Sequence, residues 1–292
     1  MLVLDKVHQQ FIDHLKTKDR APATIMAYGK DIEQLLTHIK SLGNSKIEKV
    51  EKSHLEDFLK KLETEGYTKK SISRKINSMK TFFRFLKVNE FITDDPATLI
   101  VHPKFETPTP RILTPTEYRA LRDSAREDIR TLAIIEVLLQ TGVRIGELAE
   151  LRVKNIKLNE KEGKGNLSVP ESRATLGREL PLNNAAFSAL KSYLLDRPKS
   201  QNPDEFFFIT RNNKPLLVRN IRASIDRYFK KAAIINASVH ALRHTWIAHH
   251  IKKGASLVLV SKMAGHRRLS TTEKYLKYVE APSKEKMKLE EL

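Results

Sequence analysis

The sequence predicts a mainly α-helical protein of two domains, with one small antiparallel β-sheet in the second domain. Three observations lead to this fold class. Apolar residues recur at helical spacing through most of the chain, a proline-rich stretch interrupts that spacing once, and short strand-like segments occur only beyond the interruption. The length of 292 residues favours two domains, although it does not exclude one.

The predicted first domain, residues 1–93, contains helices and no strand. Helices are expected at 4–17, 22–42, 52–65 and 68–87, with Gly43 and Gly66 where helices stop. In the last helix one face is apolar and the other is basic. The basic residues considered for DNA binding are Lys69, Lys70, Arg74, Lys75, Lys80 and Arg84. Such a face either contacts DNA or is simply solvated.

Residues 94–112 are expected to form an extended linker, because helical periodicity fails there and four prolines occur, Pro96, Pro103, Pro108 and Pro110. The second domain, 113–280, then begins with the capping pattern Thr114-Pro115-Thr116-Glu117. Its expected helices are 115–125, 127–141, 144–152, 184–195, 218–232, 239–253, 256–264 and 271–278. Its expected strands are 153–158, 166–171 and 177–182. The tail, 281–292, is either frayed or docks on a neighbouring subunit.

The composition limits the class of partner and the chemistry. The chain has 53 Lys and Arg against 35 Asp and Glu, a net charge of +18, which favours nucleic acid over an anionic membrane surface as the partner. No apolar run is long enough to span a bilayer and no signal peptide is evident, so we expect a soluble, cytoplasmic protein. Because the chain has no cysteine, thiolate nucleophiles and cysteine-ligated zinc are excluded.

Two segments carry basic residues suited to binding a phosphate. Thr141–Leu148 places Arg144 and Glu147 three residues apart at the start of a helix, where an arginine can meet a phosphate beside the positive end of the helix dipole. His240–Trp246 places His240 and Arg243 on one helical face.

A third segment, Ser256–Tyr278, can deliver a tyrosine. Ser256 is expected to cap a short helix that ends at Gly265, with His266 just beyond it. His266 and Tyr275 would lie on opposite sides of one continuous helix. The capping-box pattern Ser270–Glu273 instead predicts a new helix with Tyr275 in its second turn.

These three segments, in this order, resemble the tyrosine recombinase family, which includes phage integrases and the Xer-type and transposon-encoded resolvases. The resemblance covers the whole chain. It implies a four-helix, SAM-like core-binding domain and an α+β catalytic domain that form a C-shaped DNA clamp, and a homo-tetramer on two specific DNA sites. It also implies that Arg144, His240, Arg243 and His266 surround the scissile phosphate, that Glu147 supports the site, and that Tyr275 is the nucleophile.

The sequence departs from the family at one catalytic position. The family has a lysine between its second and third strands that protonates the leaving 5′ oxygen, and counting back from Leu180-Pro181-Leu182 reaches Arg173. Arginine is a poor proton donor, so its role would be electrostatic or another group donates. Lys164 is the alternative, but it lies 17 residues before Pro181. Arg173 is favoured.

The expected reaction requires neither a metal nor another cofactor. The Tyr275 hydroxyl needs a base at neutral pH, for which His240 is the candidate, while Arg144 and Arg243 stabilise the negative charge of the transition state. The product is a 3′-phosphotyrosyl bond and a free 5′ hydroxyl, and two strand exchanges through a Holliday junction complete recombination.

Other interpretations are weaker. The spacing of His240 and His244 suits a zinc site, but the usual carboxylate signature is missing. Tyr278 competes with Tyr275 as the nucleophile. A type IB-like topoisomerase shares the attack chemistry, and an inactive DNA-binding architectural protein would share the charge. The DNA target and the choice between integration, excision and resolution are not encoded in any recognisable motif.

Overall fold

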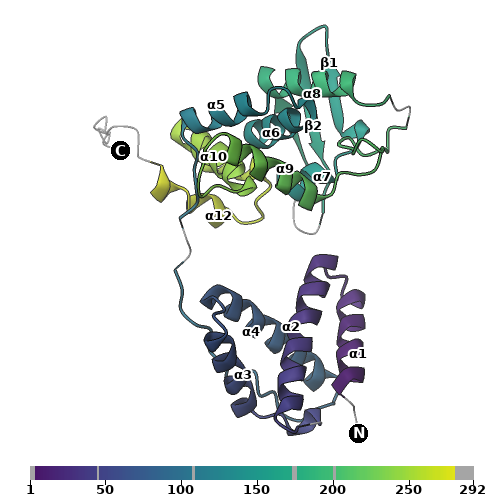
Figure 1. Cartoon of the computed structure of the whole chain (residues 1–292), viewed down its shortest axis with the longest axis vertical. Coiled ribbons are helices and arrows are strands. Elements are labelled where there is room, and N and C mark those ends of the chain that lie inside the picture. Colours follow the sequence, from purple (N-terminus) through teal and green to yellow (C-terminus); the bar gives the residue numbers. More distant parts are fainter. Residues whose placement is uncertain (1–3, 45, 107–108, 173–175, 200–201, 280–292) are drawn as a thin grey trace, which may run out of the picture. The chain divides into compact units, whose positions relative to one another are not determined.

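The computed structural model describes residues 4–44, 46–106, 109–172, 176–199 and 202–279. The chain divides into two compact units, Met1–Thr107 and Pro108–Leu292 (Figure 1). Each unit has its own hydrophobic core. The expected tail, 281–292, lies outside the described residues. Among the described residues, no helix is both long enough and apolar enough to cross a bilayer.

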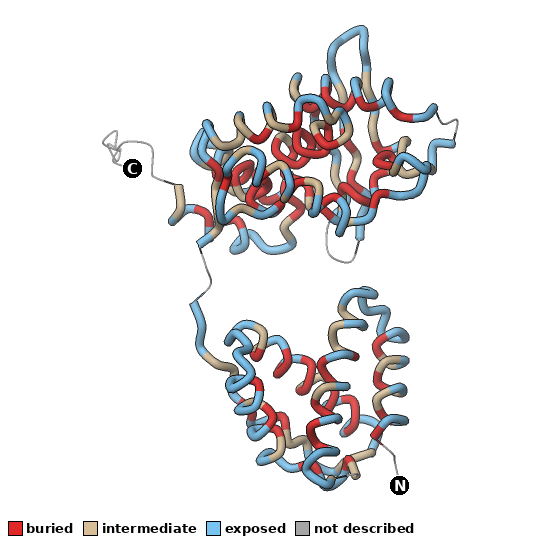
Figure 2. The backbone as a smooth tube through the Cα atoms, in the orientation of Figure 1, coloured by how far each residue is buried: buried red, intermediate tan, exposed pale blue. Residues whose placement is uncertain are grey.

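The described residues of the first unit form four α-helices, and the helices expected from the sequence are confirmed to within about two residues. They are α1 (Leu4–Thr17), α2 (Pro22–Ser41), α3 (Lys52–Thr64) and α4 (Lys69–Val88), with a short 3₁₀ turn at Ile47–Lys49. Their buried residues face one another, as Figure 2 shows. The aromatic rings of Phe11, Phe58, Phe82 and Phe83 are fully buried in this core.

Part of the stretch expected to be a linker belongs to the first unit. Ala97 is fully buried and Ile100 is 4% exposed, and both pack into the core of the four helices. Apolar side chains that leave water in this way hold the chain against the domain. The expectation of an extended linker over all of 94–112 is therefore wrong at these two residues.

One basic residue of α4 does not lie on the exposed face where the sequence placed it. Lys75 is 5% exposed, and its Nζ donates to Asp31 Oδ1 at 2.9 Å and to Gln34 Oε1 at 2.6 Å. The buried Asp31 carboxylate on α2 also accepts hydrogen bonds from Arg74 and from Ser78. A buried carboxylate requires such partners, and this demand turns Lys75 inward.

The described residues of the second unit form eight α-helices and one small sheet. Three of the helices precede the strands in the sequence and five follow them. The helices are α5 (Pro115–Ser124), α6 (Ile129–Thr141), α7 (Ile145–Ala149), α8 (Asn184–Asp196), α9 (Val218–Lys231), α10 (Val239–Lys252), α11 (Leu257–Ala264) and α12 (Ser270–Glu273). The expected caps are confirmed where Thr114 Oγ1 accepts from Glu117 N and where Ser256 Oγ accepts from Leu259 N. Helix α6 packs against α8 and α10 in the core.

The sheet is antiparallel and has the order β1 (Ile156–Asn159), β2 (Lys164–Val169), β3 (Arg178–Leu182), with Leu167 paired to Leu180. The first strand begins later than expected, because Val153–Asn155 forms a 3₁₀ turn. The Asn155 side chain closes this turn by accepting a hydrogen bond from the Arg152 N–H at 2.8 Å. The sheet places the start of β3 beside α11.

Candidate active site

A left-handed glycine delivers Arg144 to the site. Helix α6 ends at Gly142, which has a φ of +65°, and α7 begins three residues later. Arg144 therefore stands at the N-cap of α7, as the sequence suggested, where its backbone N–H donates to Glu147 Oε2 at 2.8 Å. Its guanidinium donates to Glu147 Oε1, also at 2.8 Å. The carboxylate thus fixes both the backbone and the side chain of Arg144.

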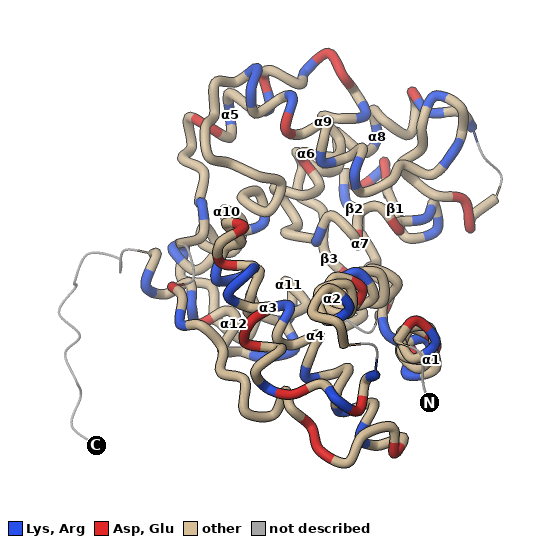
Figure 3. The backbone as a smooth tube through the Cα atoms, turned by 60° about the horizontal axis from the view of Figure 1, so that its bottom comes forward, with Lys and Arg blue, Asp and Glu red and all other residues tan. Residues whose placement is uncertain are grey.

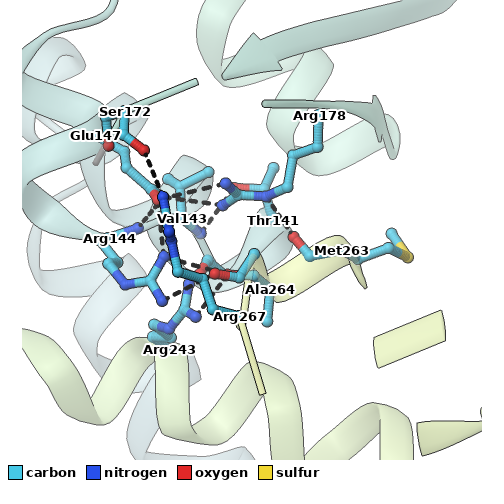
Figure 4. Close-up of polar contacts among 12 residues, drawn as sticks. Thr141, Val143, Arg144, Glu147, Ser172, Arg178, Arg243, Met263, Ala264 and Arg267 are labelled. Atoms are coloured by element: carbon cyan, nitrogen blue, oxygen red, sulfur yellow. Dashed lines mark hydrogen bonds and ion pairs between the residues drawn. The ribbon is translucent and has the colours of Figure 1, made fainter. Parts of the chain in front are cut away.

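Three guanidinium groups converge on the C-terminal end of α11 (Figure 4). They belong to Arg144, Arg178 and Arg243, which come from α7, β3 and α10. Their hydrogen-bond acceptors there are the backbone carbonyl oxygens of Met263, Ala264 and Gly265. The last carbonyls of a helix have no partner within it, so cations at this end satisfy them and interact favourably with the helix dipole.

Arg178 belongs to this arginine cluster, although the sequence did not single it out. Its side chain is 4% exposed, donates to Glu147 Oε2 at 2.8 Å and to the Met263 carbonyl at 2.6 Å, and so joins β3, α7 and α11. A signal was present. Arg178 alternates with Leu180 and Leu182, which places an arginine on the buried face of the strand.

Arg243 is the most buried of these three arginines as a whole residue, at 7% exposed, whereas Arg144 and Arg178 are only partly buried. It donates to the carbonyl oxygens of Gly142 and Ala264. Burial, followed by the nearby charge of Arg144, lowers its pKa to about 10. Arg243 is therefore still a cation at neutral pH, and an anion entering the site would find that charge poorly screened.

His266 lies just past the left-handed Gly265 that ends α11, as expected. Its Nδ1 is 2.8 Å from the hydroxyl of the buried Thr272. Burial first, and then the charges of Arg243 and Arg144, lower the pKa of His266 to about 4. The ring is therefore neutral at physiological pH. With Nδ1 engaged by Thr272, its Nε2 can carry the proton and donate to a ligand.

The helix expected at 271–278 is interrupted, and the capping box is wrong. Helix α12 spans only Ser270–Glu273, and a 3₁₀ turn follows at Leu276–Tyr278, so Tyr275 lies between them. Leu269 is the N-cap and makes no side-chain cap. The Glu273 N–H, which the Ser270 hydroxyl was expected to satisfy, donates instead to the Leu269 carbonyl at 3.1 Å.

Tyr275 is buried at 7% exposed, and its ring packs in a cluster with Trp246, Ile247, Val260 and Ala264. Its hydroxyl lies 2.6 Å from His244 Nδ1. Burial raises the pKa of Tyr275, while the charges of Arg243 and Arg144 oppose that shift. The tyrosine hydroxyl is thus within electrostatic reach of both predicted phosphate-binding arginines.

The remaining predicted residues lie in different surroundings. His240 is exposed one turn before His244 on α10, and Tyr278 is half-buried in the 3₁₀ turn after Tyr275. Arg173 lies outside the described residues, although the preceding Ser172 carbonyl accepts a hydrogen bond from Arg267 at 3.2 Å. Lys164 is the first residue of β2, and its side chain is largely exposed. No group of three His, Asp or Glu side chains in the described ranges is arranged to hold a metal ion.

A two-unit chain whose second unit brings a buried tyrosine next to paired arginines and a histidine defines a class of protein, the tyrosine recombinases. The family comparisons agree. The phage integrase family matches residues 111–281, and the N-terminal SAM-like domain of phage integrases matches residues 8–90. The chain belongs to the phage integrase family, and it is a tyrosine recombinase, an enzyme that cleaves and rejoins DNA.

Individual relatives span nearly the whole chain. A tyrosine recombinase of Thermosipho africanus is 31% identical over 94% of this chain and 95% of its own. Tyrosine recombinase XerC of Oceanobacillus iheyensis is 29% identical over 91% of this chain and 89% of its own. Among solved structures, a Tn1549 transposon integrase in complex with transposon right end DNA is 18% identical, covers 94% of both chains and superimposes with a TM-score of 0.76. The last comparison supports the fold.

Proposed function

We propose that this enzyme performs site-specific recombination by attack of the Tyr275 hydroxyl on the scissile phosphate. The attack forms a 3′-phosphotyrosyl bond and releases a 5′ hydroxyl. A different 5′ hydroxyl then reverses the step, and two such exchanges proceed through a Holliday junction. Because the phosphotyrosyl bond retains the energy of the phosphodiester, the reaction needs neither ATP nor a metal ion.

The observation that carries this proposal is the charge around Tyr275. Arg144 and Arg243 both act on the pKa of its hydroxyl, and both are anchored on the carbonyls at the end of α11. Attack by the hydroxyl adds negative charge to the non-bridging oxygens of the phosphate. Cations held in a partly dry site stabilise that charge without reorganising. The arginines therefore act mainly on the transition state.

Three other residues complete the phosphate site in this proposal. His266 donates from Nε2 to a non-bridging oxygen, and its contact with Thr272 supports that orientation. His240 binds the phosphate from the exposed surface of α10. Glu147 supports the site by holding Arg144. Arg173, at the position of the family lysine, stabilises the leaving 5′ oxygen.

The first unit supplies DNA contacts through α4. Lys75 is buried and is no longer a candidate for DNA binding. The basic residues of α4 that remain candidates are Lys69, Lys70, Arg74, Lys80 and Arg84. Figure 3 marks the basic residues along this helix. Both units would bind one DNA site, and four protomers would pair two sites. Since the substrate is DNA, the enzyme would act in the cytoplasm on the nucleoid.

The test uses covalent trapping on a DNA site chosen by the protein itself. Full-length protein with Tyr275→Phe, which should bind without attacking, is used to select double-stranded sites from a random-sequence pool. The selected duplex is then nicked at successive positions so that a short 5′-hydroxyl fragment leaves after cleavage. We expect wild-type protein to form a denaturation-resistant DNA adduct, in the presence of EDTA as well, and Tyr275→Phe to form none.

Matched variants separate the alternatives. If Tyr278→Phe abolishes the adduct while Tyr275→Phe does not, the nucleophile is misassigned. Binding without an adduct from wild-type protein would instead indicate a DNA-binding protein that lacks strand cleavage. A 5′-phosphorothiolate substrate, whose leaving group needs no proton, tests the role of Arg173. Rescue of Arg173→Ala by that substrate would show that the residue acts on the leaving group.

A further inference from the structure

The hydroxyl of Tyr275 is hydrogen-bonded to a histidine of α10 that is not one of the phosphate-binding residues proposed for the site. His244 Nδ1 lies 2.6 Å from the hydroxyl oxygen, and the two ring centroids are 5.7 Å apart with an interplanar angle of 42°. His244 stands on α10, next to Arg243, whereas Tyr275 comes from the turn between α12 and the final 3₁₀ turn. The contact therefore joins two separate elements.

The tyrosine ring has little freedom to leave this partner. The ring packs against Trp246 and Ile247 of α10 and against Val260 and Ala264 of α11. A buried ring with these neighbours places its oxygen at a fixed point, as close packing requires. His244 is therefore held next to the Tyr275 hydroxyl by the packing of the site.

The charge states of the two groups allow the tyrosine hydroxyl to be the donor in this contact. Burial, followed by the charges of His240 and Arg243, lowers the pKa of His244 to about 4, so the imidazole is neutral at physiological pH. Burial raises the pKa of Tyr275, so its hydroxyl keeps its proton. A neutral imidazole with its proton on Nε2 offers the Nδ1 lone pair as an acceptor. The hydroxyl then donates to Nδ1 and keeps its own lone pairs free for attack.

Building on the function proposed above, we propose that His244 is a catalytic residue that accepts the proton of Tyr275 as its oxygen attacks phosphorus. The O–H bond breaks while the O–P bond forms, and the proton moves to Nδ1. The 5′ oxygen leaves with the electron pair of the broken P–O bond and takes a proton from solvent, to which Nδ1 then releases its own. Religation runs the same transfer backwards.

The geometry assigns this step to His244 instead of His240. Among the described residues, His244 is the side chain that hydrogen-bonds the Tyr275 hydroxyl, while His240 is exposed on the preceding turn of α10. A proton acceptor must be within hydrogen-bond reach of the proton that it takes. His240 can bind the phosphate without taking this proton.

The test compares His244→Asn and His244→Ala with the wild-type chain in single-turnover cleavage of the selected, nicked duplex. Asparagine places an amide oxygen near the position of Nδ1 and can accept the hydrogen bond, but it cannot take up the proton. At pH 7 both variants should cleave on the order of 100-fold more slowly than wild type, which is the usual worth of general-base catalysis. Raising the pH should narrow the gap, because a phenolate needs no acceptor.

Two controls separate a chemical effect from a structural one. His249→Asn changes an exposed histidine on the same helix and should cleave within twofold of wild type. DNA affinity and the thermal midpoint of His244→Asn should stay close to those of wild type, since the amide oxygen still accepts the hydrogen bond of the buried Tyr275 hydroxyl. His240→Asn should slow cleavage without recovery at high pH.

Each outcome is decisive. If wild-type protein forms no adduct with the selected duplex, the proposed function fails and this inference fails with it. If wild type cleaves and His244→Asn cleaves within threefold of it, His244 only positions the hydroxyl and the inference is wrong. A loss in both His244 variants that persists unchanged to high pH overturns it as well, as does pH rescue of His240→Asn in place of the His244 variants.

Discussion

Replacing Arg178 with methionine should destabilise the second unit more than any comparable change at its surface. The Arg178 and Glu147 side chains are 4% and 8% exposed, and Arg178 also donates to the Met263 carbonyl. Breaking a buried ion pair by removing one partner costs about 3–5 kcal/mol. Because Glu147 keeps its hydrogen bonds to Arg144, we expect Arg178→Met to lower the free energy of unfolding by about 3 kcal/mol, the low end of that range. That is a large part of the about 5–15 kcal/mol that a domain has in total.

Arg227→Met is the matched control, since it removes the same functional group from an ion pair at the surface. Its side chain is 66% exposed and lies 3.9 Å from Asp128, so the expected loss is below about 1 kcal/mol. Urea unfolding followed by the fluorescence of Trp246, the single tryptophan, reports on this unit. With a slope of about 2 kcal/mol/M, the midpoint of Arg178→Met should fall by about 1.5 M. Equal midpoints for the two variants would refute the reasoning.

Three further results are expected. Gly142→Ala should lower the free energy of unfolding more than Gly254→Ala. Both glycines have positive φ, but of the two only Gly142 would place a Cβ against another side chain, 2.4 Å from the Trp246 ring, and equal losses in urea unfolding would exclude this clash. Stability should fall as the pH drops from about 6.5 to 4, because the unfolded chain protonates His266 in that window while the folded chain, with a pKa of about 4, does not. A His266→Gln variant that keeps the full slope of stability against pH would contradict this assignment. Lys69→Ala should weaken DNA binding and reduce the slope of log affinity against log salt by about 0.9, the value for one phosphate contact; an unchanged slope would remove Lys69 from the interface.

Local sequence signals predicted most of the helices and their ends, because each depends on a few adjacent residues. Thr114 and Ser256 cap helices by their own hydroxyls, and Gly265 ends α11 in the left-handed conformation. Packing faces followed from periodicity in the same way. Leu242 and Trp246, four residues apart on α10, are 0% and 3% exposed.

Features that depend on distant partners were not predictable. Lys75 is buried because Asp31, on another helix, requires a counter-charge. Arg178 is held by Glu147, which lies on a different element and is 31 residues away in the sequence. The spacing of His244 from His240 indicates at most a zinc pair, because its contact with Tyr275 requires two elements to meet in space.

The capping box at Ser270 shows how a local pattern can mislead. The residue types fit the pattern, but the Leu269 carbonyl accepts from the Glu273 N–H, the donor that the Ser270 hydroxyl was expected to satisfy. Tyr275 still lies on a separate short element, as the sequence suggested. Its support is the packing of the ring and not a helix cap.

The identity of the nucleophile tests the central claim most directly. Wild-type protein is trapped on the selected duplex, the DNA is trimmed by nuclease, and the protein is digested with trypsin. Cleavage after Lys274 and Lys277 places Tyr275 and Tyr278 in different peptides, so mass spectrometry assigns the phosphorylated residue without ambiguity. The nucleotide or phosphate should be found on the peptide that begins with Tyr275. Its presence on the peptide that begins with Tyr278, or on neither, would contradict the account.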